Sequence, residues 1–280
     1  PNHPLLLFSL GKLHLRSGNP TLAASVLRQA VALDPTQVDY HYALGLALNQ
    51  LGHNSDALKE LDIAYQAQPD NPEYAYAYGA TLLALGDASA AHQPLQSAIQ
   101  QKTFTTPEPY VDYARAVLDL QRVNDATISP LSALEAVEHA LKIDPAYPAA
   151  KACYAEAQRA CNNHQAAFDA YREALDTNLT DDRRWRERLS YGMGRAAYQL
   201  GQYDIAIATA QEAISAAPHN ADNYKLLSDA DLASDLFEDA LRSARTVLNL
   251  NIDDMANLAW YADQVVRLIA HSNALALPTY

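Results

Sequence analysis

The chain repeats a pattern of small residues at a fixed step of 34 positions. The same step separates the members of four sets: Gly11, Gly45 and Gly79; Gly18, Gly52 and Gly86; Ala23, Ala57 and Ala91; Ala30, Ala64 and Ala98. A period of this size is typical of a solenoid, in which each repeat packs only on its neighbours. It predicts an extended binding surface rather than an enclosed catalytic pocket.

The second repeat indicates what the small residues do. Residues 42–51 and 55–66 are predicted to form two helices, with Gly52 between them, where a helix C-terminus favours glycine. Gly45 is small enough to let the two helices cross closely. Pro69 ends the second helix because proline lacks the N–H that a helix interior requires. One helix pair cannot bury both of its apolar faces, so the next pair must cover it.

This pattern resembles the tetratricopeptide repeat (TPR). The second repeat matches the family's large, small and proline places with His41, Leu44-Gly45, Leu48, Ala57, Leu61, Ala64 and Pro69. The resemblance implies an all-α fold, a right-handed superhelical solenoid of antiparallel helix pairs, formed as a single array over residues 1–280. The expected units are 4–37, 38–71, 72–106, 107–147, 148–186, 187–220 and 221–254, followed by a capping helix at about 255–271 and a tail at 272–280.

The fourth unit exceeds the 34-residue step by about seven residues, roughly 122–129. We interpret them as a surface loop, with a contact loop at one edge of the solenoid as the alternative. Ser129-Pro130 then restarts a helix, and Ser132 and Glu135 have the spacing of a capping box.

A second extension, residues 180–188, precedes the sixth unit and adds about five residues. Thr180, Asp181 and Asp182 suit a helix N-terminus. We therefore expect the first helix of the sixth unit to be longer by more than a turn.

Composition excludes several classes of function. The formal net charge of −13 opposes general binding to nucleic acid or anionic membranes, which requires a basic surface. No apolar run reaches the ~18 residues of a membrane span. Cys153 and Cys161 lie roughly 12 Å apart along one predicted helix, too far for a disulfide, so two reduced and mostly buried thiols are expected.

No group of residues predicts catalysis, and we expect no catalytic residue, cofactor or metal. The nine histidines lack metal-binding spacing. Gly192-Met193-Gly194 is half of a dinucleotide-binding motif, but no strand precedes it and Gly194 already serves as the small crossing residue of its repeat. Asp181-Asp182 and Asp253-Asp254 each precede a predicted helix, where acidic residues suit the helix dipole.

The first residues contain no recognisable targeting signal. Leu5-Leu6-Leu7-Phe8 is short and in repeat phase, so it is interpreted as part of the first helix. A cytoplasmic location is expected. The alternative is a targeting segment removed earlier, because the chain begins at Pro1 without methionine.

In TPR arrays the first helix of each pair lines the concave surface, which the resemblance transfers to this chain place by place. The implied surface is aromatic and apolar in its N-terminal part and charged in its C-terminal part. It predicts these partner-binding residues: Phe8, Tyr42, Leu46, Tyr76, Arg115, Arg159, Arg184, Arg188, Tyr191, Arg195, Tyr198 and Lys225. The expected partner is a protein or peptide with acidic and apolar residues. The family's chaperone-tail clamp and asparagine ladder are both absent.

The first helix of the sixth unit holds the most informative group. Three arginines on one helix face are not buried unpaired. The face is therefore solvated, meets an acidic partner, or forms internal ion pairs, with Glu156 and Asp229 as expected partners of Arg195. Trp185 nearby either covers the gap left by the extended helix or stands exposed as an anchor. Spacings of 4, 3, 4 and 3 place five residues on this face: Arg184, Arg188, Tyr191, Arg195 and Tyr198.

These observations favour a non-catalytic scaffold that binds a protein segment in its concave groove. One alternative is a docking domain of a larger enzyme or assembly factor. Another is self-association, and the chain is expected to be a monomer or a weak homo-oligomer formed through its C-terminal helix. The last helix contains Trp260, Tyr261, Val265, Val266 and Leu268 and has no partner helix after it. Its open face would be covered either by residues 274–277 folding back or by another chain.

Overall fold

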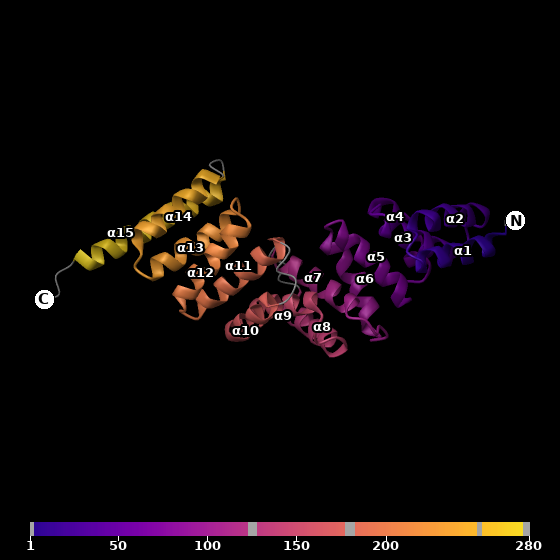
Figure 1. The fold of residues 1–280 in the computed structure, drawn as a ribbon, viewed down its shortest axis with the longest axis horizontal. Helices are drawn as coiled ribbons and strands as arrows, with labels where there is room; N and C mark the ends of the chain where they lie inside the picture. Colours follow the sequence, from indigo (N-terminus) through magenta and orange to yellow (C-terminus); the bar gives the residue numbers. More distant parts are fainter. Residues whose placement is uncertain (1–2, 123–127, 177–182, 251–253, 277–280) are drawn as a thin grey trace. The chain divides into compact units, whose positions relative to one another are not determined.

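The structure is a computed structural model that describes residues 3–122, 128–176, 183–250 and 254–276. Within these residues the chain forms fifteen α-helices and no strand (Figure 1). The helices follow one another in pairs, which confirms the all-α class and the helix-pair solenoid. They belong to two compact units, Pro1–Pro145 and Ala146–Tyr280. A single array over the whole chain stays a prediction.

The first unit contains four helix pairs. The two helices of a pair pack together, each second helix packs on the next first helix, and neighbouring first helices also touch. The pairs are α1 (Pro4–Arg16) with α2 (Pro20–Leu33), α3 (Val38–Gln50) with α4 (Asn54–Ala67), α5 (Pro72–Ala84) with α6 (Ala88–Gln100), and α7 (Glu108–Arg122) with α8 (Pro130–Ile143).

The second unit contains three helix pairs and a final helix. α15 (Met255–Ala276) packs on α14. The pairs are α9 (Pro148–Ala160) with α10 (His164–Leu175), α11 (Arg183–Gln199) with α12 (Tyr203–Ala216), and α13 (Ala221–Ala233) with α14 (Phe237–Leu250).

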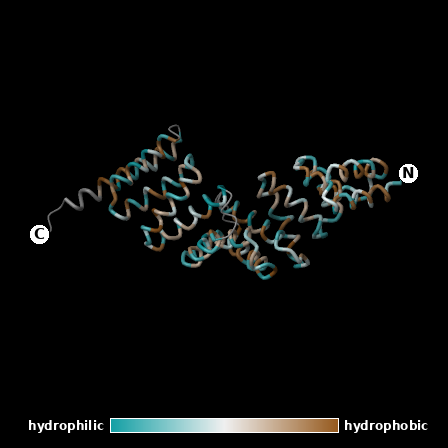
Figure 2. Tube along the Cα trace, in the orientation of Figure 1, coloured by the Kyte–Doolittle hydropathy of each residue, from teal (hydrophilic) through white to brown (hydrophobic). Residues whose placement is uncertain are grey.

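Second helices form the centre of each pair through a buried triplet spaced four and three residues apart. In α4 the triplet is Ala57, Leu61 and Ala64, all fully buried. Leu61 packs over Gly45, where a Cβ atom would lie 2.5 Å from its Cγ. All seven second helices bury such a triplet. Hydrophobic residues therefore recur every three or four positions among hydrophilic ones along these helices (Figure 2). The 34-residue step is therefore the step of helix crossings.

The turn inside most pairs requires a left-handed residue. Gly52 has a φ of 75° after α3, a conformation that glycine adopts without a Cβ penalty. Two pairs place another residue type there: Asn162 has a φ of 60° and Asp235 a φ of 61°. Asparagine and aspartate tolerate this region better than other residues.

Two expectations about helix ends are wrong. Ser129, not Ser132, is the N-cap of α8, and its Oγ accepts the backbone N–H of Leu131 at 3.3 Å. Proline at the first helical position already has helical φ, so the cap must be the residue before Pro130. α15 runs to Ala276 rather than to about 271, so residues 274–276 continue the helix and do not fold back.

The two extended regions are described only in part. Residues 123–127 of the expected loop and 177–182 of the second extension, with Thr180, Asp181 and Asp182, lie outside the described residues. α11 begins at Arg183 and has 17 residues, against 13 in α9 and α13. In the described part of the chain no helix combines the length and apolar character needed to cross a membrane.

Candidate partner-binding surface

A cavity of about 380 Å³ opens in the first unit between α1, α3 and the start of α5. It is lined by Phe8, Tyr42 and Leu46, three of the residues expected in the N-terminal part of the groove. All three are half-buried. The ring of Tyr42 packs 4.7 Å from that of Tyr74, and burial with the charge of Glu73 raises the pKa of Tyr42 to about 12. The Tyr42 hydroxyl therefore stays neutral and able to donate a hydrogen bond at physiological pH.

Charged residues that the sequence-based site omitted surround this cavity. Lys12 and Arg16 line it from α1, and the Lys12 Nζ lies 5.2 Å from the centre of the Phe8 ring. Asp39 and Glu73 line it from α3 and α5. Asp39 and Glu73 are themselves one 34-residue step apart, a signal that the sequence contained. The cavity thus has an apolar lining with cations and anions at its edges.

Tyr76 and Arg115 lie elsewhere in the first unit and do not line this cavity. The Tyr76 hydroxyl donates to Asp112 Oδ2 at 3.1 Å, and Arg115 Nη1 lies 3.2 Å from Asp112 Oδ1. Burial raises the pKa of Asp112, while Arg115 and Tyr76 oppose the rise. Both residues therefore help to hold a half-buried carboxylate between α5 and α7.

In the second unit, the expected ion pairs of Arg195 are wrong. Glu156 of α9 is bound by Arg188, whose Nη2 lies 2.7 Å from Oε2 while Nε donates to Oε1. Asp229 accepts a hydrogen bond from Gln264 of α15. Arg188 lies seven residues, about two turns, before Arg195 on the same face of α11, so the two guanidinium groups meet different parts of the neighbouring helices. Arg188 also lies 5.5 Å from the ring of Trp185.

Arg195 lies two turns further along this helix face and is exposed. Its side chain is exposed, its guanidinium lies 6.0 Å from the centre of the Tyr191 ring, and it makes no ion pair within the described residues. Burial raises the pKa of Tyr191, and Arg195 opposes this. Tyr198 is half-buried, with its ring 5.6 Å from that of Tyr203. Arg184 is exposed at the start of α11.

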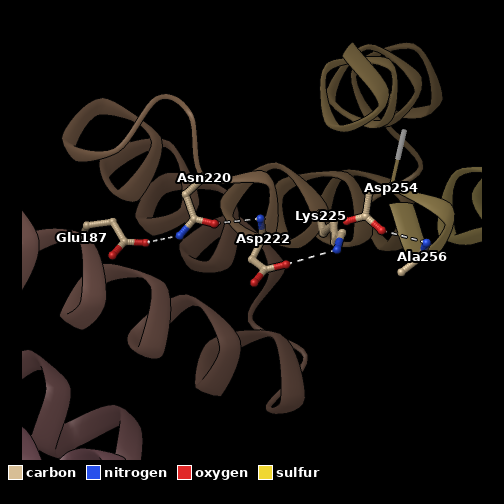
Figure 3. A network of polar contacts seen from close by, with 6 residues as sticks. All are labelled: Glu187, Asn220, Asp222, Lys225, Asp254 and Ala256. Atoms are coloured by element: carbon tan, nitrogen blue, oxygen red, sulfur yellow. Dashed lines mark hydrogen bonds and ion pairs between the residues drawn. The ribbon is translucent and has the colours of Figure 1, made fainter. Parts of the chain in front are cut away.

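Arg159 and Lys225, the other expected cations of this unit, are half-buried. Burial raises the pKa of the Tyr171 phenol, which Arg159 opposes. Lys225 Nζ lies 3.2 Å from Asp222 Oδ1, within a chain of contacts that continues through Asn220 to Glu187 of α11 (Figure 3). Lys225 is thus already paired inside the protein.

The remaining expectations concern Trp185, the cysteines and metal sites. Trp185 is partly buried against the core of the second unit, which agrees with a covering role. Both cysteines are free thiols; Cys153 is buried and Cys161 partly so. In the described ranges no cluster of histidine, cysteine or carboxylate side chains is arranged to hold a metal ion. Gly192 lies within α11 under the Tyr171 ring, a packing role unlike that of a nucleotide-binding loop.

Comparison with known proteins gives a family and a fold. A family model described as tetratricopeptide repeat matches residues 8–71, 42–104 and 191–248. The search of curated proteins found no match.

Among solved structures, a chain of the APC/C hetero-tetramer Cut9–Hcn1 has a TM-score of 0.62 and 16% identity, over 95% of this chain and 48% of that one. This chain therefore spans about half the length of that relative. A tetratricopeptide repeat protein from Parabacteroides merdae has a TM-score of 0.55 and 14% identity, over 94% of this chain and 98% of that one. PilF of Pseudomonas aeruginosa has a TM-score of 0.56 and 20% identity, over 81% of this chain and 97% of that one. These identities support similarity of fold alone.

Proposed function

The chain belongs to the tetratricopeptide repeat family, and on this basis we propose that it is a non-catalytic scaffold that binds a segment of a partner protein. The main binding site is the cavity between α1, α3 and α5 in the first unit. The observation that carries the proposal is that an open cavity of about 380 Å³ is lined by Phe8, Tyr42 and Leu46.

The partner segment presents a large apolar side chain to this cavity. Half-buried aromatic rings supply contact area at little cost in conformational entropy, which is why such residues dominate binding surfaces. Phe8 and Tyr42 are already held by ring contacts with Tyr40 and Tyr74, at 4.8 and 4.7 Å. Their positions are therefore set before the partner arrives, which reduces the entropy lost on binding.

An acidic residue of the segment lies beside its apolar residue. Lys12 and Arg16 of α1 are exposed at the edge of the cavity and have no carboxylate partner among the described residues. A carboxylate placed there gains an ion pair. Asp39 of α3 and Glu73 of α5 disfavour acidic residues beside these two helices, so the charges also orient the segment.

A second contact is proposed in the other unit, at Arg195. Arg188 of α11 and Lys225 of α13 are already paired within the protein, whereas Arg195 of α11 is exposed. Acidic residues of the partner would pair with Arg195 and pack on Tyr191.

A random peptide library displayed on phage tests the first site. Peptides enriched on the protein are expected to carry a large apolar residue close to aspartate or glutamate. Leu46→Glu should abolish their capture, because it introduces a charge into the apolar lining. The matched control is Ile63→Glu, at an exposed residue of α4 in the same repeat. Absence of enrichment, or equal loss in both variants, would overturn the proposal.

The second contact is tested separately with Arg195→Glu. It should weaken capture of acidic peptides and reduce the salt dependence of binding, because one ion pair is lost. Arg245→Glu, at an exposed residue of α14, has the same charge change on the opposite helix layer and should leave binding as it is. If both variants weaken capture equally, the effect is one of net charge and the contact at Arg195 is wrong.

A further inference from the structure

Another cavity of the first unit measures about 430 Å³ and is lined by the last turns of α6, the start of α7 and one face of α8. The proposed peptide site, in contrast, is built from α1, α3 and the start of α5. A cavity of this size suits a small molecule, since ligand pockets range from about 300 to 1,000 Å³. Its polar side chains indicate what kind of molecule fits.

Two lysines and a histidine gather at the C-terminal ends of α6 and α8. Lys102 follows α6, and Lys142 lies in the last turn of α8. Burial and the charges of both lysines lower the pKa of His139, so both ammonium groups act on the same neutral ring. The two lysines are exposed, and neither makes an ion pair within the described ranges. Their charges are therefore available to an anionic group.

A neutral donor lies beside these cations. Tyr110 of α7 also lines the cavity, is 1% exposed, and has its ring centre 4.4 Å from that of His139. Its hydroxyl is buried and has no hydrogen-bond partner in the described part of the chain, and burial raises its pKa. The hydroxyl therefore stays protonated. Because a buried hydroxyl without a partner is unfavourable, an acceptor such as a carboxylate stabilises it.

Carboxylates line the same cavity from earlier turns of α8. Glu138 and Glu135 precede Lys142 by four and seven residues, which is about 6 and 10 Å along the helix axis. Both glutamates are exposed, and neither is paired among the residues that the structure describes. They repel a simple anion, whereas a molecule that also carries an ammonium group gains an ion pair. The cavity therefore favours a ligand with both charges.

The rest of the lining includes apolar surface. Tyr113 and Ala136 are buried there and Ile99 is half-buried. Ligand pockets combine such surface with a few polar groups that fix the orientation of the ligand. An apolar side chain on the ligand therefore has a place to pack.

We propose that this cavity binds a free α-amino acid with an apolar or aromatic side chain. Lys102, Lys142 and the Tyr110 hydroxyl bind its carboxylate group. Glu135 and Glu138 bind its ammonium group. The inference does not depend on the proposed scaffold function, because the two sites lie on different helices.

Titration with L-phenylalanine and two analogues that each lack one charge tests the ligand class. Saturation-transfer NMR detects binding, and calorimetry gives the affinity. L-phenylalanine should bind, whereas 3-phenylpropionate and phenethylamine should bind at least about tenfold more weakly, because each loses a charged contact. Failure of both L-phenylalanine and L-leucine to bind, or equal binding of the two analogues and L-phenylalanine, would overturn the proposal.

Charge variants locate the site. Lys102→Gln/Lys142→Gln should weaken binding of L-phenylalanine about tenfold or more. The matched control is Lys59→Gln, at a lysine of α4 whose side chain is 74% exposed, and it should leave binding as it is. Equal weakening by Lys59→Gln would contradict the site.

Glu135→Gln/Glu138→Gln gives a readout that a folding defect cannot imitate. It should weaken binding of L-phenylalanine and strengthen binding of 3-phenylpropionate, because the repulsion of a simple anion is removed. If both ligands bind more weakly or neither changes, the glutamates do not hold an ammonium group and the proposal is wrong.

Tyr110→Phe removes only the unpaired hydroxyl. It should weaken binding of L-phenylalanine without lowering the midpoint of thermal unfolding, because the hydroxyl has no partner in the described protein to lose. Unchanged affinity would exclude Tyr110 from the carboxylate site.

Discussion

Arg188 of α11 holds the buried carboxylate of Glu156 on α9, with two nitrogen atoms on its two oxygen atoms. Glu156 is 3% exposed and the arginine side chain 30% exposed. The pair joins the first helices of two neighbouring repeats. Arg188 therefore belongs to the structure of the second unit, whereas Arg195 of the same helix is exposed.

Removing Arg188 should destabilise the protein strongly. Arg188→Met removes the two hydrogen bonds of the Arg188 guanidinium from the buried Glu156 carboxylate, at an expected loss of about 3 kcal/mol in the free energy of unfolding. The double variant Arg188→Met/Glu156→Met should recover most of this, because the buried carboxylate charge is removed together with its cation. Urea unfolding measures both. Arg195→Met, at an exposed site, is the control and should change stability by less than about 0.5 kcal/mol. Equal losses for Arg188→Met and Arg195→Met would contradict this account of the pair.

The stability of the last repeat should depend on the ionisation of Asp231. Burial, with the charge of Asp239, raises its pKa from 3.8 to about 6. Between pH 3.8 and about 6 the folded state therefore keeps a proton on Asp231 that the unfolded chain releases. The stabilisation that comes from this proton is fully present below pH 3.8 and is lost as the pH rises through about 6. At pH 7 the ionised, buried carboxylate costs up to about 3 kcal/mol.

Asp231→Leu tests this, since Leu48 and Leu82 occupy the same place in other repeats and are buried there. The variant should be more stable than the parent at pH 7, and its advantage should shrink between pH 6 and pH 4. Urea unfolding across this range gives the difference at each pH. A difference that does not change with pH would show that packing, not ionisation, is responsible.

Glycine should be stabilising at two turns that lack it. Asn162 and Asp235 have left-handed φ values in the place where Gly18 and Gly52 stand in other repeats. Asn162→Gly and Asp235→Gly should each add about 0.5 kcal/mol or more, because the Cβ strain of the left-handed region is removed. Thermal unfolding measures the gain. Ser17→Gly is the control: its φ is −85°, so the substitution should only destabilise. A gain there as well would point to a general effect of glycine.

The close crossing of α3 and α4 should tolerate no side chain on Gly45. Gly45→Ala places a Cβ atom 2.5 Å from Leu61 Cγ and should cost about 1–3 kcal/mol through overpacking. Leu61→Ala alone leaves a cavity and should cost about 2–5 kcal/mol. The double variant should cost less than the sum, because the added methyl fills part of the cavity. Additive losses would mean that the two residues do not touch as described.

Much of the architecture could be predicted from single residues. The step from Gly45 to Gly79 locates successive helix crossings, and Pro72, Pro130 and Pro148 start helices at their first positions. These effects are local: a missing Cβ, a fixed φ or a missing N–H acts within one turn of helix. The repeat step predicts an end of the last helix near residue 271, whereas α15 continues to Ala276, because residues 272–276 contain no strong stop signal and the first proline after them is Pro278.

The candidate binding site was predictable only in part. Place-by-place transfer selected Phe8, Tyr42 and Leu46, and the structure brings these three around one cavity. The same transfer gave Arg195 the wrong ion-pair partner, since it assumed that charges at equal places in neighbouring repeats face each other.

The helix pairs and their 34-residue step follow from the amino-acid sequence alone, because a period in small residues fixes where helices cross. Which side chains meet between repeats depends on how the helices pack in three dimensions. Helical spacing sets the direction of a side chain on its own helix, but the tilt between neighbouring helices sets which residue it reaches. That tilt brings Arg188 to Glu156, places His41 between Glu60 and the carbonyl of Pro35 at 2.6 and 2.9 Å, and leaves Arg195 exposed.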